Sequence, residues 1–352
     1  MRNIVILQQI VPDYRVNFFN ELYKNLDFEL YVSKQGLEQS ISTVSKNTKF
    51  KINIVKKINF FNFVIFQFIP FKKLFSKEII IFEFNIRILS NILLLIIRIF
   101  ANKKNILWTH GITKNMSLFS RLIRIFFLKK ATSIIVYENS GKNNLVKLGI
   151  AEENIYVSKN SIDNRDMIKR IDNNQNKFRI TFIGRIIKDK NVDLLCSAFL
   201  SILDKINSSI VLTIIGDGDE LKILKKKFTN NRIEFIGHLN EEKKISYYLN
   251  QTLFTVSPDY LGLAIIHSFS YSIPILVNKN PNIKHSPEIE LFIENQNGWY
   301  FDGTQESLQQ KIIKCLENID ILRKFGLTGL KQVKEEYGIQ NMSERFLQAI
   351  KG

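Results

Sequence analysis

Two loop segments constrain this chain more than any other feature, because each follows a buried-strand pattern and leads into a helical one. They are residues 182–190, with the sequence FIGRIIKDK, and residues 257–274, which begin SPDYLGL. Apolar, β-branched runs followed by helical patterns are typical of parallel sheets, in which ligands bind at the carboxyl ends of the strands. The two segments therefore predict an α/β fold with a ligand site at this edge of a sheet.

The alternation of strand and helix patterns occurs twice along the 352 residues. Residues 1–162 and 178–335 each have the size of one domain, and the polar run 163–177 between them lacks apolar periodicity, as expected of a linker. Residues 336–352 form a last helix that we expect to pack back on the first domain. We predict two Rossmann-like domains facing each other across a cleft, with a helical C-terminal tail.

The individual elements follow from the hydrophobic period. Strand patterns cover residues 4–8, 28–32, 52–55, 79–84, 106–108, 134–137, 155–157, 179–183, 210–215, 233–236, 253–256 and 275–277. Helical patterns cover residues 16–25, 86–100, 118–129, 142–147, 192–206, 221–228, 241–249, 263–271 and 305–350, the last interrupted near residues 326–329 and at Gly338.

Composition and charge narrow the class of partner. The 50 Lys and Arg residues exceed the 33 Asp and Glu, for a formal net charge of +17, which favours phosphates, acidic lipids or nucleic acid. Cys196 and Cys315 lie far apart in apolar helical patterns, so they predict neither a disulfide nor a metal site and indicate a reducing compartment. The apolar run 86–100 contains two arginines and is too short to span a bilayer, and the one at 4–7 is too short for a signal peptide.

Arg185 and Lys190 are candidates for binding a diphosphate. Gly184 and Arg185 follow a strand pattern directly, and Lys190 comes five residues after Arg185, so one short loop places both cations at the strand end. A guanidinium and an ammonium there would clamp a diphosphate and stabilise the charge on a leaving nucleotide. The alternative is a solvated basic loop in a Lys-rich chain.

The second loop joins turn residues to a helix start, where unpaired N–H groups and the helix dipole favour an anion. Gly262 would let the backbone approach phosphate oxygens closely. Asp259 would accept hydrogen bonds from sugar hydroxyls, and His267, farther along the helix, would reach a ribose. Alternatively, Asp259 is only a cap and His267 is structural.

Three further patterns bear on function. His110 ends a strand pattern before Gly111, a position aimed at the predicted cleft, although it would also suit a histidine that satisfies the turn. The Asp-x-Asp pair in residues 216–219 fits a strand-ending turn better than a metal site. The chain has no His/Cys metal cluster and neither glycine-rich nucleotide-binding motif, which argues against zinc enzymes, dinucleotide dehydrogenases and P-loop NTPases.

Two basic and aromatic stretches, residues 56–77 and 118–130, have the composition of surfaces that bind anionic membranes. The alternative is that their apolar residues belong to the domain core.

Over nearly its whole length the sequence resembles glycosyltransferase family 4, whose members have the two-domain GT-B fold. The most specific segments are FIGR at 182–185 with Lys190, IIGDG at 214–218, FIGHL at 235–239, and the run from SP at 257–258 to Pro274. In the first domain, VPDYR at 11–15 resembles the family's first loop, without its glycine pair, and WTHG at 108–111 resembles its cleft histidine motif.

This resemblance implies a set of site residues. The implied catalytic residues are His110, Arg185, Lys190 and Asp259. The implied donor-binding residues are Gly184, Arg185, Lys190, Gly216, Gly237, His238, Leu261, Gly262, Leu263 and His267, and Tyr14 and Arg15 are expected on the acceptor side. Asp259 and His267 stand where the family usually has two glutamates, and the GLAIIHS run at 262–268 resembles a surface-polysaccharide branch of the family with histidine at the second position.

The activity that the resemblance implies is retaining transfer of a sugar from a UDP- or GDP-linked donor. The acceptor would be a hydroxyl of a bacterial surface glycan, such as O-antigen, capsule or lipopolysaccharide, carried on a lipid at the cytoplasmic face of the membrane. No metal or other cofactor is expected, and no nucleic acid. Two alternatives stay open on sequence alone: a nucleic-acid-binding protein, suggested by the charge, and an inert scaffold, suggested by the missing glutamates.

Overall fold

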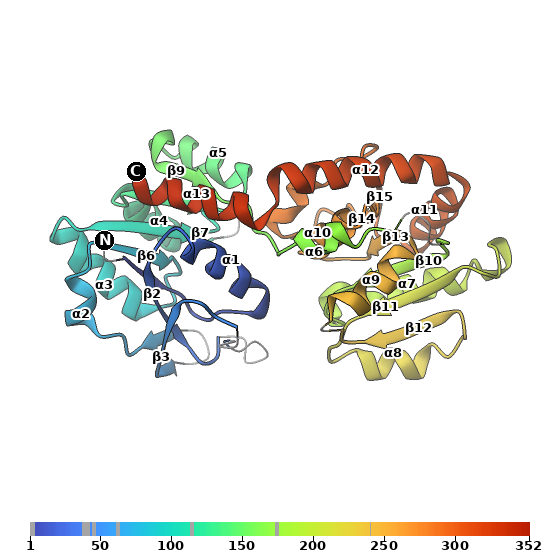
Figure 1. Ribbon diagram of the computed structural model, residues 1–352, viewed down its shortest axis with the longest axis horizontal. Coiled ribbons are helices and arrows are strands. Elements are labelled where there is room, and N and C mark those ends of the chain that lie inside the picture. The colour runs from blue at the N-terminus through green and yellow to red at the C-terminus, as the bar shows by residue number, and fades with distance from the viewer. Residues whose placement is uncertain are drawn as a thin grey trace. The chain divides into compact units, whose positions relative to one another are not determined.

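The computed structural model of the chain describes residues 4–36, 43, 47–60, 64–112, 116–172, 176–239 and 241–352 (Figure 1). The chain forms two compact units. The first contains Met1–Asp163 together with Ile339–Gly352, and the second contains Asn164–Gly338.

The first unit is built on a parallel sheet of seven strands in the order β3-β2-β1-β6-β7-β8-β9. The strands are β1 (Ile4–Leu7), β2 (Phe28–Ser33), β3 (Lys51–Val55), β6 (Ile79–Glu83), β7 (Lys104–Thr109), β8 (Ser133–Val136) and β9 (Ile155–Val157). Strands β1 and β8 are buried along their whole length because helices cover both faces of the sheet. Strand order reverses between β1 and β6, which are direct neighbours.

Helices cover the two faces of this sheet. One face packs against α1 (Asp13–Tyr23) and α13 (Ile339–Lys351), which contact each other. The other face packs against α2 (Phe71–Phe75), α3 (Leu89–Phe100), α4 (Leu118–Lys129) and α5 (Asn139–Lys147). A separate antiparallel hairpin joins β4 (Lys57–Phe60) to β5 (Val64–Gln67).

The second unit contains a parallel sheet of six strands in the order β12-β11-β10-β13-β14-β15. The strands are β10 (Arg179–Ile183), β11 (Val211–Ile215), β12 (Ile233–Gly237), β13 (Thr252–Ser257), β14 (Ile275–Asn278) and β15 (Gly298–Phe301). The helices are α6 (Arg165–Lys169), α7 (Val192–Leu200), α8 (Leu221–Lys227), α9 (Glu242–Asn250), α10 (Ala264–Ser270), α11 (Gln305–Glu317) and α12 (Ile319–Glu336). Short 3-10 turns are η1 (Glu152–Asn154) in the first unit and η2 (Lys188–Lys190), η3 (Leu203–Lys205) and η4 (Pro287–Leu291) in the second.

The two Rossmann-like sheets confirm the predicted α/β fold class. Every strand predicted from the sequence is present, with ends that differ by one or two residues. The sequence patterns did not predict β15, the β4–β5 hairpin, α2 or α6. Helix α6 lies in the segment predicted as a linker and contacts α9 and α10, while residues 173–175 of that segment lie outside the described residues.

The predicted helix interruption near residues 326–329 is wrong, because α12 continues through it. The two glycines there permit close packing instead of ending the helix. A Cβ at Gly326 would lie 2.0 Å from the Ser272 carbonyl oxygen, and one at Gly329 would lie 2.6 Å from the Phe269 ring. The helical tail is broken at Asn318, between α11 and α12, and again between α12 and α13, where the predicted interruption at Gly338 is confirmed.

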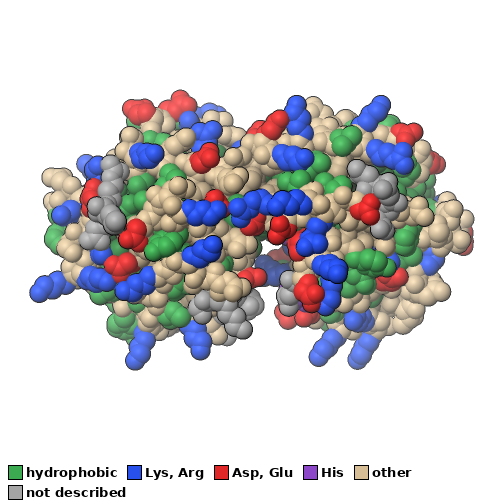
Figure 2. All heavy atoms as spheres, in the orientation of Figure 1, with side chains coloured by type: hydrophobic (Ala, Val, Ile, Leu, Met, Phe, Trp, Pro, Cys, Tyr) green, Lys and Arg blue, Asp and Glu red, His purple; other side chains and the backbone are tan. Residues whose placement is uncertain are grey.

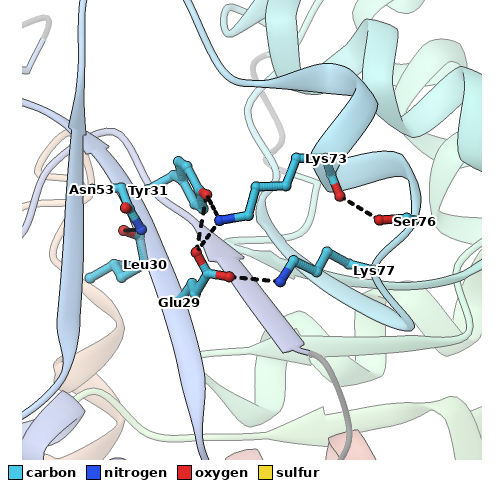
Figure 3. Close-up of polar contacts among 7 residues, drawn as sticks. All are labelled: Glu29, Leu30, Tyr31, Asn53, Lys73, Ser76 and Lys77. Atoms are coloured by element: carbon cyan, nitrogen blue, oxygen red, sulfur yellow. Dashed lines mark hydrogen bonds and ion pairs between the residues drawn. The ribbon is translucent and has the colours of Figure 1, made fainter.

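A polar cluster fastens α2 to β2 (Figure 3). The Glu29 carboxylate accepts hydrogen bonds from Lys73 Nζ at 2.8 Å, Lys77 Nζ at 2.6 Å and the Tyr31 hydroxyl at 3.1 Å. Burial alone would raise the pKa of Glu29, but these hydrogen bonds lower it to about 2. The same contacts raise the pKa of Lys73 to about 12, so Glu29 and Lys73 are both charged at neutral pH.

Arg98 of α3 is completely buried and joins several loops at the amino end of the sheet. Its Nε donates to Asn105 Oδ1 at 2.8 Å. The two remaining nitrogens donate to the carbonyl oxygens of Leu74, Phe75, Lys77, Glu78 and Lys104 at 2.8–3.3 Å. One side chain therefore donates to five backbone carbonyl groups, four that precede β6 in the sequence and one at the start of β7.

Candidate active site

The two loops singled out by the sequence follow the two strands at which the order of the second sheet reverses. Strand β10 is followed by β11 and β12 on one side, whereas its neighbour β13 continues to β14 and β15 on the other. Such a reversal leaves a crevice at the carboxyl ends of the strands, where open α/β folds bind ligands. The Tyr260 amide donates to the Asp189 carbonyl oxygen at 3.2 Å, so the loops after β10 and β13 are in direct contact.

Lys190 lies between these loops. Its Nζ donates to the Tyr260 carbonyl oxygen at 2.6 Å and lies 4.2 Å from the centre of the Tyr260 ring. Burial and the charge of Arg185 lower the pKa of Lys190 to about 8, although Asp259 and Glu288 oppose that shift. Burial and a neighbouring cation destabilise the charged form of this amine. A bound anion therefore stabilises that charge more than it would stabilise the charge of an exposed amine.

Gly262 keeps the space next to this amine open. A Cβ at Gly262 would lie 3.7 Å from Lys190 Nζ and 3.5 Å from the Tyr260 ring. Any side chain at this position would therefore lie in van der Waals contact with the amine. Arg185 is exposed on the same loop as Lys190. Asp259 lies in the other loop, after β13, and burial raises its pKa.

A histidine that the site prediction did not include holds the second loop in place. The Leu261 amide donates to His285 Nδ1 at 3.0 Å, and His285 Nε2 lies 2.9 Å from the Asn278 carbonyl oxygen. Nδ1 therefore accepts and Nε2 carries the proton, and burial lowers the pKa of the ring, which favours this neutral form. Asn278 Nδ2 in turn donates to the Pro258 carbonyl oxygen at 2.7 Å.

We expect His285→Ala to lower kcat/KM by about 10- to 100-fold, because the loop that carries Leu261 and Gly262 would lose its anchor near the reacting groups. Steady-state kinetics and thermal denaturation of the variant measure the effect and check the fold. The exposed neighbour Lys284 provides the matched control, Lys284→Ala, which should behave as wild type. Unchanged kinetics in His285→Ala would show that the hydrogen bonds of His285 do not position the loop.

Glycines at the ends of β10, β11 and β12 let the loops approach one another. A Cβ at Gly216 would lie 1.8 Å from the Gly184 carbonyl oxygen, which leaves no room for a side chain. Gly237 has a φ of 85°, in the left-handed region that favours glycine. Asp217 Oδ1 accepts from the Gly218 amide at 2.8 Å, as expected of a turn. Among the described residues, no three His, Cys, Asp or Glu side chains form a group that would hold a metal ion.

The two other predicted histidines of this unit differ in environment. His238 follows β12 and is exposed. His267 lies in α10, its Nδ1 is buried without a hydrogen-bond partner in the described structure, and burial lowers its pKa to about 4. The ring is neutral at physiological pH and keeps one nitrogen available to a ligand.

The first unit has an equivalent reversal point between β1 and β6. The Gln9 amide donates to Glu83 Oε2 at 2.6 Å across the ends of these strands. Burial raises the pKa of Glu83, against the effects of this hydrogen bond and of the Arg15 charge. Arg15 is buried, stacks over Trp108 at 4.7 Å and donates to Asn160 Oδ1 at 3.1 Å.

His110 follows β7 at the same edge of this sheet. Its ring stacks on Tyr137 with centroids 4.5 Å apart. The residue is exposed at its surface, but desolvation by the surrounding protein and the charges of Arg15 and Arg124 lower its pKa to about 4. His110 is therefore neutral near pH 7 and suits hydrogen bonding better than proton donation. Tyr14 is exposed at the start of α1, close to the Arg15 guanidinium.

The structure thus brings the predicted residues together in two groups. In the second unit, Lys190, Asp259, Leu261 and Gly262 surround one point at the β10–β13 reversal, and Gly184, Gly216 and Gly237 form the neighbouring strand ends. In the first unit, His110, Tyr14 and Arg15 gather around Trp108 and Tyr137.

Two Rossmann-like units, each built on a parallel sheet, are the architecture of the GT-B class, and comparison with known proteins agrees. Residues 163–332 match the family model described as glycosyl transferases group 1. The chain can be superposed over its full length on the crystal structure of Anabaena Alr3699/HepE in complex with UDP, with a TM-score of 0.72, 13% identity and 100% coverage of both chains. The protein is a glycosyltransferase with the GT-B fold.

Similar sequences carry the same activity in their names. An uncharacterized glycosyltransferase of Methanocaldococcus jannaschii, MJ1069, is 25% identical over 343 residues, which cover 94% of this chain and 78% of that protein. The O-antigen biosynthesis glycosyltransferase WbnH of Escherichia coli is 25% identical over 231 residues, covering 64% of this chain and 62% of that protein. These comparisons favour the glycosyltransferase over the nucleic-acid-binding protein considered from the sequence.

No helix in the described part of the chain is both long enough and apolar enough to cross a bilayer.

Proposed function

We propose that the protein transfers a sugar, with retention of anomeric configuration, from a nucleoside diphosphate sugar to a hydroxyl of a lipid-linked bacterial surface glycan. The observation that carries this proposal is the Lys190 amine at the β10–β13 reversal, beside the space that Gly262 leaves open. Lys190 and Arg185 bind the diphosphate and stabilise the charge that develops as it leaves.

The remaining residues of the second unit bind the rest of the donor. Asp259 orients the sugar through its hydroxyls, and the Gly262 and Leu263 amides contribute to phosphate binding at the start of α10. His267 takes the place of a glutamate and hydrogen-bonds the ribose, a role supported by its buried, unpartnered Nδ1 in the described structure. His110 of the first unit hydrogen-bonds the donor sugar in its neutral form, as its pKa of about 4 favours.

The identity of the donor and the acceptor is inferred from relatives. The Anabaena structure contains UDP, and WbnH is named for O-antigen biosynthesis, so a UDP-sugar is the first donor to test and a GDP-sugar the second. Tyr14 and Arg15 belong to the acceptor side, Tyr14 as a contact and Arg15 through its packing under Trp108. The reaction takes place at the cytoplasmic face of the membrane and uses no metal cofactor.

A thermal-shift screen of UDP-, GDP- and other nucleotide sugars tests the proposal, because a ligand of the native state raises the melting temperature. We expect one nucleotide class to give a concentration-dependent increase, and its labelled sugar to be transferred to a lipid-linked glycan. Absence of any shift across the screen, with the protein folded, would contradict the proposed function.

A further inference from the structure

The positive charge of the chain is concentrated in one stretch of the first unit. Residues 39–137 contain 17 Lys and Arg and only two acidic residues, Glu78 and Glu83, which gives this stretch +15 of the chain's net charge of +17. Between Glu83 and Glu138, 54 residues contain nine basic side chains and no acidic one. The candidate active site does not explain this charge, since Lys190 and Arg185 lie outside the stretch and His110 within it is neutral.

The same stretch exposes most of the large apolar side chains on the surface. Among the described residues, 13 of the 20 exposed large hydrophobic side chains fall within it. On α3 they form a stripe of residues three or four positions apart, Leu89, Leu93, Ile97 and Phe100, and on α4 they are Leu118, Phe119, Leu122 and Phe126. Phe100 and Leu118 are 83% and 78% exposed, so these two side chains are not partly covered core residues.

Both stripes lie on the outer surface of the same helical layer. Leu94 and Leu95 of α3 and Phe127 and Leu128 of α4 are buried in one core with β6 and β7. Since both helices turn these sides to the same face of the sheet, their opposite sides face solvent together. In Figure 2, hydrophobic and basic side chains lie next to one another over the part of the first unit where Figure 1 labels α2 and α3.

Exposed basic residues border the two stripes. Lys103 and Lys104 follow α3, and Arg121, Lys129 and Lys130 belong to the end and outer side of α4. We call the two stripes and these five cations the α3–α4 surface. Residues 61–63 and 113–115, which are near these segments in sequence, lie outside the described residues and are not part of it.

We infer that the α3–α4 surface docks on an anionic membrane. The Leu, Ile and Phe side chains enter the boundary between head groups and acyl chains, and the Lys and Arg side chains bind acidic head groups. This inference adds to the proposed function. The choice of the cytoplasmic leaflet rests on the lipid-linked acceptor proposed there. The surface itself is argued from residues outside the candidate active site.

Charge and side-chain type favour a membrane over two other partners. A second copy of the chain, joined through the same surface, would bring two strongly basic faces together, and like charges repel. Nucleic acid would match the charge, but five of the eight stripe residues are Leu or Ile, which offer no planar face on which bases stack. An anionic bilayer matches both the cations and the aliphatic stripes.

Vesicle sedimentation tests this inference, using phosphatidylcholine vesicles with and without phosphatidylglycerol. We expect the full chain to bind only the anionic vesicles and to bind less as salt is raised. The variant Leu118→Ser/Phe119→Ser/Leu122→Ser should lower the partition coefficient by about tenfold or more. The variant Arg121→Gln/Lys129→Gln/Lys130→Gln should lower it comparably and remove most of the salt dependence.

A matched control removes exposed apolar side chains from the second unit. Ile223 and Leu327 are 58% and 62% exposed, and Ile223→Ser/Leu327→Ser should bind vesicles as wild type does. Equal binding by wild type and both α3–α4 variants would overturn the inference. So would a wild-type dimer, seen by light scattering, that the Leu118→Ser/Phe119→Ser/Leu122→Ser variant dissociates, or nucleic acid that binds through this surface while anionic vesicles do not bind.

The donor screen separates this inference from the proposed function. All variants should keep the wild-type thermal shift with the nucleotide sugar in the absence of vesicles, because none touches the second-unit loops. Vesicle binding that fails while the thermal shift persists counts against docking alone. A thermal shift that is absent in wild type counts against the proposed function alone.

Discussion

Replacing Lys190 with alanine should reduce turnover by about 100-fold or more with the native donor. The amine lies between the loops at the β10–β13 reversal and is held there by the Tyr260 carbonyl oxygen at 2.6 Å. Loss of a charged group that stabilises the leaving diphosphate has an effect of this size. Arg185→Ala should act in the same direction, and initial rates at saturating donor measure both.

The pH dependence gives a second readout for the same residue. The folded-state pKa of Lys190 is about 8, below its usual value of 10.5, so the amine loses its charge as pH rises through about 8. Donor binding should therefore weaken above that pH in wild type. Lys190→Arg, which stays charged, should bind donor with a flatter profile at high pH.

Lys188 provides the matched control for these variants, because it lies on the same loop and is exposed. Lys188→Ala should keep the wild-type rate and pH profile. Near-normal turnover in both Lys190→Ala and Arg185→Ala would mean that neither cation takes part in transfer.

Replacing Arg98 with leucine should destabilise the first unit by about 3–5 kcal/mol, the loss expected when several buried polar groups lose their partner. The side chain is fully buried and donates to Asn105 and to five backbone carbonyl oxygens. Leucine would remove all of these donors and leave a cavity in their place.

The two tryptophans make this prediction measurable unit by unit. Trp108 lies in the first unit and Trp299 in the second, and the chain has no others. In a Trp299→Phe background, denaturant unfolding followed by fluorescence therefore reports on the first unit. Lys130→Leu, at an exposed position, should leave the transition where it was. A change of less than about 1 kcal/mol for Arg98→Leu would show that the buried guanidinium contributes little net stability.

The sequence predicted the parts of the fold that local patterns specify. Strands such as β1 and β10 are apolar and β-branched, and their ends could be placed within one or two residues. Strand β15 was missed because it has only four residues and begins with Gly298. Its glycine is needed because a Cβ there would lie 2.0 Å from the Ile275 carbonyl oxygen, a contact that no local pattern reveals.

The candidate site was predictable to a similar extent. Lys190 and Gly262 could be identified because each follows a strand pattern, and the topology brings them together. The role of His285 in the site was missed, since its hydrogen-bond partners Leu261 and Asn278 come from separate parts of the chain. In the sequence, Arg98 only indicated that the apolar run 86–100 does not span a membrane. Its structural role could not be predicted because its hydrogen-bond partners are brought together by tertiary structure alone.

The most direct test of the central claim is whether Lys190 recognises a diphosphate. Isothermal titration calorimetry would compare a nucleoside diphosphate with the corresponding monophosphate, using the base identified in the donor screen. We predict that wild type binds the diphosphate at least about tenfold more tightly, as expected for one charge-assisted contact, and that Lys190→Ala loses this preference. An equal preference for the diphosphate in wild type and Lys190→Ala would contradict the proposed site.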